Sequence, residues 1–419
     1  MGLEYYQETD LADGPLVLSH EMPESQSVAL GIFIDVGSRD ESPNEAGITH
    51  ALEHMLFKGT KDMDVDRLAE KLDELGGNAN AYTSRERTCF HLHVLYEQWR
   101  EALDILIAMV QEPAIPADEW PREREVIYAE MAMVEDTPEE WVTDQHVEGL
   151  FPGDVIGKPV LGSHDSLASI GTEDLSSFLI HWYRPPRMLI TAAGNINHQD
   201  LVDAVGEANW RKAGEPALRK QPSAMATGLQ PLKREGGQAQ LVVSVAGINA
   251  SSEQRPVAWL ANQVLGGGLS SRLFREVREK RGLAYSIGSH LNALSDVGTW
   301  SITCGSEPER AAECVSLLSS LLNDFSDSVT PDEVERARKQ LEVQLRMGLD
   351  SVEGQMLYLG GRLDESALIS PLQWLEKIRA VEATDVSGWA AKHLSAGKLW
   401  TVAAPEQALD KICDRIRTC

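Results

Sequence analysis

The chain has 419 residues, of which 42% are hydrophobic and 6% aromatic, as in a globular protein with two or more domains. Its 65 acidic and 38 basic residues give a net charge of −27, which disfavours nucleic-acid binding because a phosphate backbone would be repelled. There is no apolar run of membrane-spanning length, and the first residues lack the bases and apolar core of a targeting peptide, so we expect no membrane association and a cytoplasmic location.

The first half of the chain predicts an α+β domain. In chain order the hydrophobic pattern indicates a strand over 28–36, helices over 48–57 and 65–75, a strand over 88–95, a helix over 99–110, and a long charged helix from Pro116 past Glu130. The second of these helices ends at Gly76-Gly77, a common C-terminal cap.

The first helix carries the motif H-x-x-E-H, in which His50 and His54 are four residues apart. On a helix both histidines project from one face, so two imidazole nitrogens can hold one Zn²⁺. Glu53 lies on the same side and can reach a water bound to that metal. Polar side chains on an otherwise apolar helix are costly unless they are paired or bound to a metal. The motif is the inverzincin signature and predicts a metal site.

A catalytic zinc site needs a third protein ligand, and Glu130 in the long charged helix is the strongest candidate. Glu123 lies two helical turns before it and faces the same way, so it could hydrogen-bond to a ligand histidine. Other glutamates of this helix have the same chemistry, and a solvated charged face is the alternative explanation. His91 and His93, on one face of a predicted strand, are rival ligands.

The second half repeats the plan of the first. It predicts strands over 240–245 and 299–303 and helices over 257–265 and 309–322. The segment 330–334 matches 116–120, and alignment of the two long helices places Ala337 and Gln344 opposite Glu123 and Glu130. The second copy also lacks H-x-x-E-H. The metal-binding residues are therefore absent together from the second copy, as expected of residues that act as one unit.

These repeats predict two homologous α/β-roll domains related by duplication, each a mostly antiparallel sheet covered by helices. We expect a metal-bearing domain over 1–215, a linker rich in Pro and Ser over 216–232, and a degenerate second copy over 233–419.

Together these residues resemble the pitrilysin/insulinase family of zinc peptidases, especially its small members akin to the mitochondrial processing peptidase β subunit. The resemblance spans nearly the whole chain and includes residues 46–60, the spacing of Glu123 and Glu130, Pro159-Val160-Leu161-Gly162, and residues 271–286. It implies a metalloendopeptidase with one Zn²⁺ per chain on His50, His54 and Glu130.

The resemblance also implies roles for other residues. Glu53 would act as the general base and Glu123 would support a ligand histidine. Arg278 and Tyr285 would hold the substrate and stabilise the transition state. The family's substrate-binding edge strand is matched by residues 77–83, so the expected peptide-binding residues are Asn78, Ala79, Asn80, Ala81 and Tyr82.

The expected substrate is a peptide or an unfolded precursor segment, cleaved inside a closed chamber. A basic peptide would be attracted by the acidic surface, although solubility or salt adaptation is the favoured explanation of the charge. Because the chain carries both the metal motif and the Arg278/Tyr285 pair, we expect a homodimer or a heterodimer with a homologous subunit. Specialised processing of one precursor, hydrolysis of a small amide and a non-proteolytic scaffold role are the alternatives.

Overall fold

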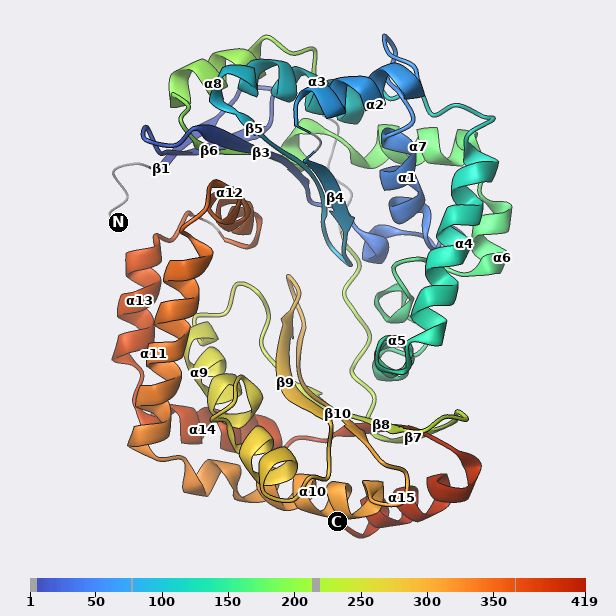
Figure 1. The fold of residues 1–419 in the computed structure, drawn as a ribbon, viewed down its shortest axis with the longest axis vertical. Helices are drawn as coiled ribbons and strands as arrows, with labels where there is room; N and C mark the ends of the chain where they lie inside the picture. The colour runs from blue at the N-terminus through green and yellow to red at the C-terminus, as the bar shows by residue number, and fades with distance from the viewer. Residues whose placement is uncertain (1–5, 77, 213–218, 366) are drawn as a thin grey trace. The chain divides into compact units, whose positions relative to one another are not determined.

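The computed structural model describes residues 6–76, 78–212, 219–365 and 367–419, which divide into two compact units. Unit 1 comprises Met1–Ala132, Lys158–Lys220 and Arg346–Ser370; unit 2 comprises Met133–Gly157, Gln221–Leu345 and Pro371–Cys419. Each unit is built on one sheet, as Figure 1 shows. The structure is thus a mixed α/β fold with two sheets and many helices, as predicted.

These units differ from the predicted continuous domains 1–215 and 233–419, because each half of the chain gives one segment to the other unit. Residues 133–157 belong to unit 2, and residues 346–370 belong to unit 1. The chain also passes from unit 1 to unit 2 between Lys220 and Gln221, inside the predicted linker 216–232. Of that range, 216–218 lie outside the described residues, and a strand begins at Gly228.

The sheet of unit 1 has the strand order β1-β2-β6-β3-β5-β4. Its strands are β1 (Tyr6–Asp10), β2 (Leu16–Glu21), β3 (Ser27–Ile34), β4 (Ala79–Thr83), β5 (Thr88–Leu95) and β6 (Met188–Gly194). Among the described strands of this sheet, β2 and β6 pair in parallel and the other neighbours are antiparallel. The central strands β3 and β6 are apolar and buried along almost their whole length, as expected for a sheet that is covered on both faces.

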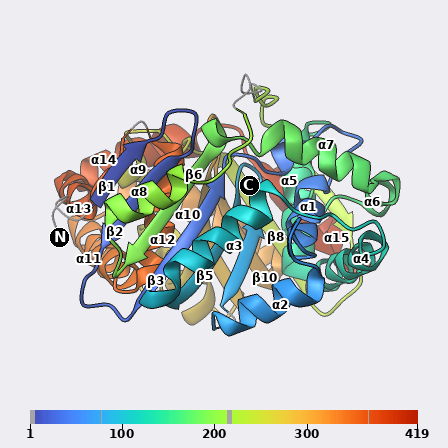
Figure 2. The same ribbon diagram turned by 90° about the horizontal axis from the view of Figure 1, so that it is seen from above.

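One face of this sheet is covered by helices of the first half of the chain (Figures 1 and 2). Helices α3 (Trp99–Gln111) and α8 (His198–Gly206) contact its inner and outer strands, and α1 (Ile48–Leu56) contacts β4. The same unit also contains α2 (Val65–Glu74), α6 (His164–Ser169), α7 (Thr172–Trp182) and the N-terminal part of α4 (Trp120–Asp136). Leu52 and Met55 of α1 are fully buried in this core with Ile32 of β3 and Phe90 of β5.

The other face of the first sheet is covered by α12 (Val352–Gly360), which comes from the second half of the chain. Met356 and Leu359 are buried there against Leu18 and Phe33. The helix crosses β3 so closely that a Cβ atom on Gly31 would lie 2.6 Å from the Met356 sulfur. A larger residue here would force the Met356 side chain to move where α12 meets the sheet.

The sheet of unit 2 has the order β7-β11-β8-β10-β9. Its strands are β7 (Gly228–Lys233), β8 (Ala239–Ala246), β9 (Ser286–Ala293), β10 (Gly298–Ser306) and β11 (Leu399–Ala404). In the part of this sheet that the structure describes, β7 and β11 pair in parallel and the other neighbours are antiparallel. Across the sheets, the order β2-β6-β3-β5-β4 of unit 1 corresponds strand by strand to β7-β11-β8-β10-β9 of unit 2. This repeat is the duplication predicted from the sequence.

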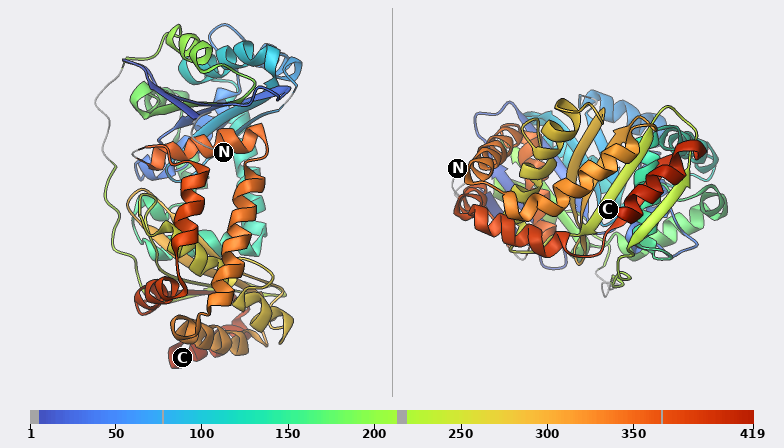
Figure 3. Two further views of the ribbon diagram at one scale, coloured as in Figure 1. Left: turned by 90° about the vertical axis from the view of Figure 1, so that its left-hand side faces the viewer. Right: turned by 90° about the horizontal axis from the view of Figure 1, so that it is seen from below.

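The helices of unit 2 follow the same scheme (Figures 1 and 3). They are α5 (Pro138–Leu150), α9 (Arg255–Gly266), α10 (Ala311–Ser328), α13 (Pro371–Ala380), α14 (Ala383–Leu394) and α15 (Glu406–Thr418), with most of α11 (Pro331–Gly348). Helix α5, from the first half of the chain, lies on β8 and β11, just as α12 lies on β3 and β6. The two halves have exchanged equivalent helices.

The predicted strands and helices are confirmed, with small differences at their ends. The strand over 88–95 has the predicted bounds, and the helix over 65–75 ends at Glu74. The long charged helix starts at Trp120 rather than near Pro116, because residues 117–119 form a turn. Among the described residues, none of the helices combines the length and the apolarity needed to cross a lipid bilayer.

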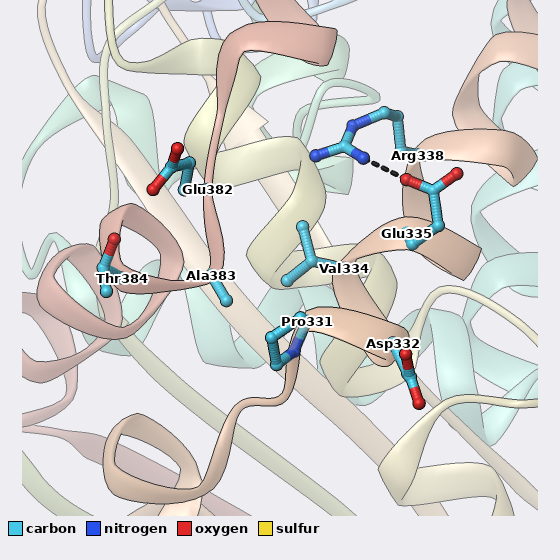
Figure 4. A pocket seen from close by; sticks show the side chains of 8 residues that line it. All are labelled: Pro331, Asp332, Val334, Glu335, Arg338, Glu382, Ala383 and Thr384. Carbon is cyan, nitrogen blue, oxygen red and sulfur yellow. Dashed lines mark hydrogen bonds and ion pairs between the residues drawn. The ribbon is translucent and has the colours of Figure 1, made fainter.

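A pocket of about 420 Å³ lies between the start of α11 and the start of α14 (Figure 4). Its lining includes the carboxylates of Asp332, Glu335 and Glu382. The Arg338 guanidinium in the same pocket binds Glu335 and the carbonyl oxygen of Val381, the latter at 2.8 Å. The bond to Val381 joins α11 to the residues just before α14, within unit 2.

The start of α11 is also fixed by a second ion pair, between Glu333 and Arg272. The Glu333 carboxylate accepts bonds of 2.8 and 2.7 Å from Arg272 and one of 3.0 Å from the Thr330 N–H. Burial opposes the charge, but these donors lower the pKa of Glu333 to about 2. Its contribution to stability is therefore present above the unfolded-state pKa of about 4.3 and is lost as the pH falls towards 2.

We expect Glu333→Gln to destabilise the protein at about pH 7 by roughly 1–2 kcal/mol, allowing for solvent screening of the pair. Urea unfolding of wild type and variant measures the difference, which should shrink at about pH 2. The control is Glu74→Gln, which breaks an exposed pair with Lys71 and should leave the midpoint unchanged. A difference that stays the same at both pH values contradicts the assignment.

Candidate metal centre

The position of α1 is fixed at its N-terminus by a buried carboxylate. Glu41 accepts hydrogen bonds from the backbone N–H groups of Gly47 and Thr49, at 2.8 and 2.9 Å. These are donors that the first turn of a helix leaves without partners. Gly47 itself has a φ of 91°, and a Cβ atom there would lie 2.6 Å from the Leu161 carbonyl oxygen. Both the left-handed backbone and the close approach of Leu161 require glycine.

Three side chains on α1 and α4 point their donor atoms at one another. The Nε2 atoms of His50 and His54 each lie 3.7 Å from the same carboxylate oxygen of Glu130, Oε2. Their ligand atoms all lie within 4.8 Å of one another, and no other such cluster of three occurs among the described residues. The two histidines and Glu130 were the predicted ligands.

The arrangement fits a small cation. A separation of 3.7 Å is too long for a hydrogen bond, whereas donors around a tetrahedral Zn²⁺ lie about 3.4 Å apart. Burial, together with the neighbouring His54, lowers the pKa of His50 to about 4, so this imidazole is neutral and has a lone pair to offer. The His50 Nδ1 atom is buried without a hydrogen-bond partner in the described part of the chain.

Behind the ligands, Glu123 of α4 joins His54 to Lys58. Its Oε2 lies 3.0 Å from His54 Nδ1, and its Oε1 lies 2.6 Å from Lys58 Nζ. Burial raises the pKa of Glu123, but the bonds from Lys58 and His54 outweigh this and hold it below its ordinary value. A carboxylate on Nδ1 fixes the ring and leaves Nε2 to face Glu130. The sequence predicted Glu123 here but missed Lys58, whose place four residues after His54 was a usable signal.

Glu53 lies on α1 between the two histidines and is 9% exposed. Burial raises its pKa, the Thr83 hydroxyl and His54 lower it, and Glu130 raises it; the net shift is upward. The Thr83 hydroxyl donates a short hydrogen bond to Glu53 Oε2. Sequence reasoning missed this contact, because thirty residues separate the partners and no local pattern connects them.

The segment expected to bind peptide contains an edge strand. Residues 79–83 form β4, the last strand of the sheet, while Gly77 lies outside the described residues. Asn80 and Tyr82 are exposed, whereas Ala79 and Ala81 pack against the core beneath. One backbone edge of β4 has no strand partner among the described residues, so it can accept an added strand.

Arg278 and Tyr285 lie together in unit 2. Arg278 is in the π-helical turn Phe274–Glu279, and its guanidinium carbon lies 4.9 Å from the Phe274 ring centre and 5.7 Å from that of Tyr285. Tyr285 is 77% exposed. An exposed tyrosine beside an arginine can donate hydrogen bonds to a ligand.

His91 and His93, the rival ligands, do not join the metal cluster. They lie on β5, and His93 Nε2 is 2.9 Å from the Ser27 hydroxyl while its Nδ1 is 3.9 Å from Glu353. The structure therefore places His93 in a side-chain network with Ser27 and Glu353.

Comparison with known proteins places the chain in a family. Residues 16–164 match the family described as Insulinase (Peptidase family M16), and residues 169–341 match the Peptidase M16 inactive domain. An uncharacterized zinc protease of Mycobacterium tuberculosis is 34% identical over 394 residues, covering 92% of this chain and 90% of that protein. One from Bacillus subtilis is 33% identical over 345 residues, covering 82% and 84%.

Solved structures share the fold. A peptidase M16 inactive domain from Pseudomonas fluorescens superposes with a TM-score of 0.89 at 22% identity, covering 96% of this chain and 98% of that one. A protease from Helicobacter pylori gives a TM-score of 0.89 at 18% identity, covering 96% and 99%. The matches to both family domains and the relatives along most of the sequence agree: the chain belongs to the insulinase family, peptidase family M16.

Proposed function

We propose that this protein is a zinc-dependent endopeptidase that hydrolyses peptides or unfolded precursor segments. The observation that carries the proposal is the convergence of His50 and His54 on Glu130, with the Glu53 carboxylate on the same helix. The zinc proteases among its relatives support the metal.

Zn²⁺ held by His50, His54 and Glu130 supplies Lewis-acid activation of a water and of the scissile carbonyl. Glu53 takes a proton from the attacking water and returns it to the leaving amine. Burial raises the pKa of Glu53, which makes its carboxylate a stronger base. Glu123 keeps the His54 ring oriented throughout.

The peptide adds as a strand along the open edge of β4. Main-chain hydrogen bonds then give affinity with little sequence preference, which suits varied or unfolded substrates. Arg278 and Tyr285 donate hydrogen bonds to the peptide or to the developing oxyanion. The acidic chain would favour basic peptides among these substrates.

A second subunit completes the site in this proposal. Unit 1 carries the metal ligands, whereas unit 2 carries Arg278 and the exposed Tyr285. In a homodimer each site would use Glu53 of one copy and Tyr285 of the other, inside a closed chamber; a homologous partner chain could serve in the same way.

Metal content tests the ligand assignment. We expect one zinc per chain in the purified protein by elemental analysis, and loss of that zinc in His54→Ala, because two remaining ligands hold the ion weakly. Glu123→Gln should weaken affinity by about 10–100-fold, since it changes the group that orients His54. His93→Ala is the matched control and should keep its zinc. Unchanged zinc in His54→Ala would refute the site.

Removal of the general base tests the reaction. Glu53→Gln should keep its zinc and fold but lose hydrolysis of unstructured peptides by at least about 100-fold, because no group remains to take the proton. Peptide cleavage followed by mass spectrometry measures this, with small amides as comparison substrates. An unaltered rate in Glu53→Gln refutes the mechanism, and hydrolysis of the small amides alone refutes the peptidase assignment.

Mixing two inactive variants tests whether copies share a site. Glu53→Gln and the double variant Arg278→Ala/Tyr285→Phe should each be inactive. If Glu53 and Tyr285 come from different copies, half of the randomly exchanged dimers contain one intact site, and activity recovers to about one quarter of wild type. No recovery after verified subunit exchange contradicts sharing between copies, and a wild type that sediments as a monomer contradicts the dimer.

A further inference from the structure

The side chain of Thr83, the last residue of β4, holds the proposed general base. Its hydroxyl donates a hydrogen bond to Glu53 Oε2. Among the residues that the structure describes, no other side chain donates to this carboxylate. The bond occupies Oε2 and leaves Oε1 to take a proton. A glutamate has several rotatable bonds, so a fixed partner decides where its carboxylate points.

The N–H and C=O groups of Thr83 lie in the plane of the sheet and point away from β5, towards the open edge. Asn78 O accepts from His93 N–H at 3.4 Å, and Ser84 N–H donates to Arg87 O at 2.7 Å. In an antiparallel pair, residues with bonds to the partner strand alternate with residues whose N–H and C=O groups point away. Thr83, which stands opposite Thr88 in this register, is of the second kind.

One residue therefore touches both the base and the edge to which a substrate strand would add. We propose that Thr83 is the positioning residue for Glu53, so that pairing of a peptide with the Thr83 backbone also fixes the orientation of the base. This inference rests on the proposed endopeptidase function. It gives β4 a part in the chemical step in addition to its part in binding.

Paired substitutions separate the hydroxyl from the shape of the side chain. Thr83→Val keeps the shape and removes the hydroxyl, and should lower kcat by about 10–100-fold, with KM within about twofold and zinc content unchanged. Thr83→Ser restores the hydroxyl and should return kcat to within about threefold of wild type. The matched control is Thr88→Val, which removes a buried hydroxyl bonded to the Val36 carbonyl oxygen at 3.0 Å. It should leave kcat unchanged.

A second measurement does not depend on activity. In the full-length protein stripped of metal, Thr83→Val and Glu53→Met each remove one end of the hydrogen bond. The urea midpoint of the double variant should shift by less than the sum of the two single shifts, because the second change removes a bond already lost. Thr88→Val combined with Glu53→Met should give additive shifts.

The outcomes separate this inference from the proposed function. A wild type that cleaves peptides while Thr83→Val does so at the same kcat overturns the positioning role and leaves the peptidase assignment standing. The positioning role is also overturned if Thr83→Ser is as defective as Thr83→Val, or if the Thr83 and Glu53 shifts are additive. A wild type that cleaves no peptide overturns the proposed function and, with it, the positioning role of Thr83.

Discussion

The crossing of α1 and α4 is the constraint on which the site depends. It brings two imidazoles from one helix and a carboxylate from the other within 4.8 Å. Glu53 is directed to β4 because it lies on α1, and Glu123 reaches His54 because it lies on α4. The buried Glu41 cap and Gly47 fix the start of α1. An error in this crossing would displace the ligands, the base and the groups that orient them together.

The charges at the site point to the same conclusion as its distances. The carboxyl groups of Glu53, Glu123 and Glu130 gather around the two histidines, and Lys58 Nζ binds the Glu123 carboxylate. A divalent cation would balance such a gathering of acidic side chains. Lys58 binds the outer carboxylate rather than Glu130, so it orients His54 without competing for the ligand oxygen.

Local sequence patterns predicted those site residues whose spacing lies within a single helix. The spacing of His50 and His54 and the two turns between Glu123 and Glu130 needed only helix periodicity, and the duplication was visible in the order of elements. Contacts between distant segments were beyond this reasoning. Nothing near Glu53 indicates Thr83, and the exchanged segments 133–157 and 346–370 cannot be read from local apolar patterns. The apolar residues of α5 and α12 indicate that each helix packs against something, but they do not indicate which of the two sheets it covers.

The exchange of α5 and α12 also shapes how the chain can fold during synthesis. The buried bond from the Tyr6 hydroxyl to Gln355 joins residues 349 positions apart, and Met356 covers β3 of the same sheet. The first sheet therefore keeps one apolar face uncovered until the ribosome has made more than four-fifths of the protein. Neither half has a complete core of its own. The sheet of the N-terminal half is covered only after α12 has been synthesised. Until then its apolar face is exposed and can bind chaperones or associate with other chains.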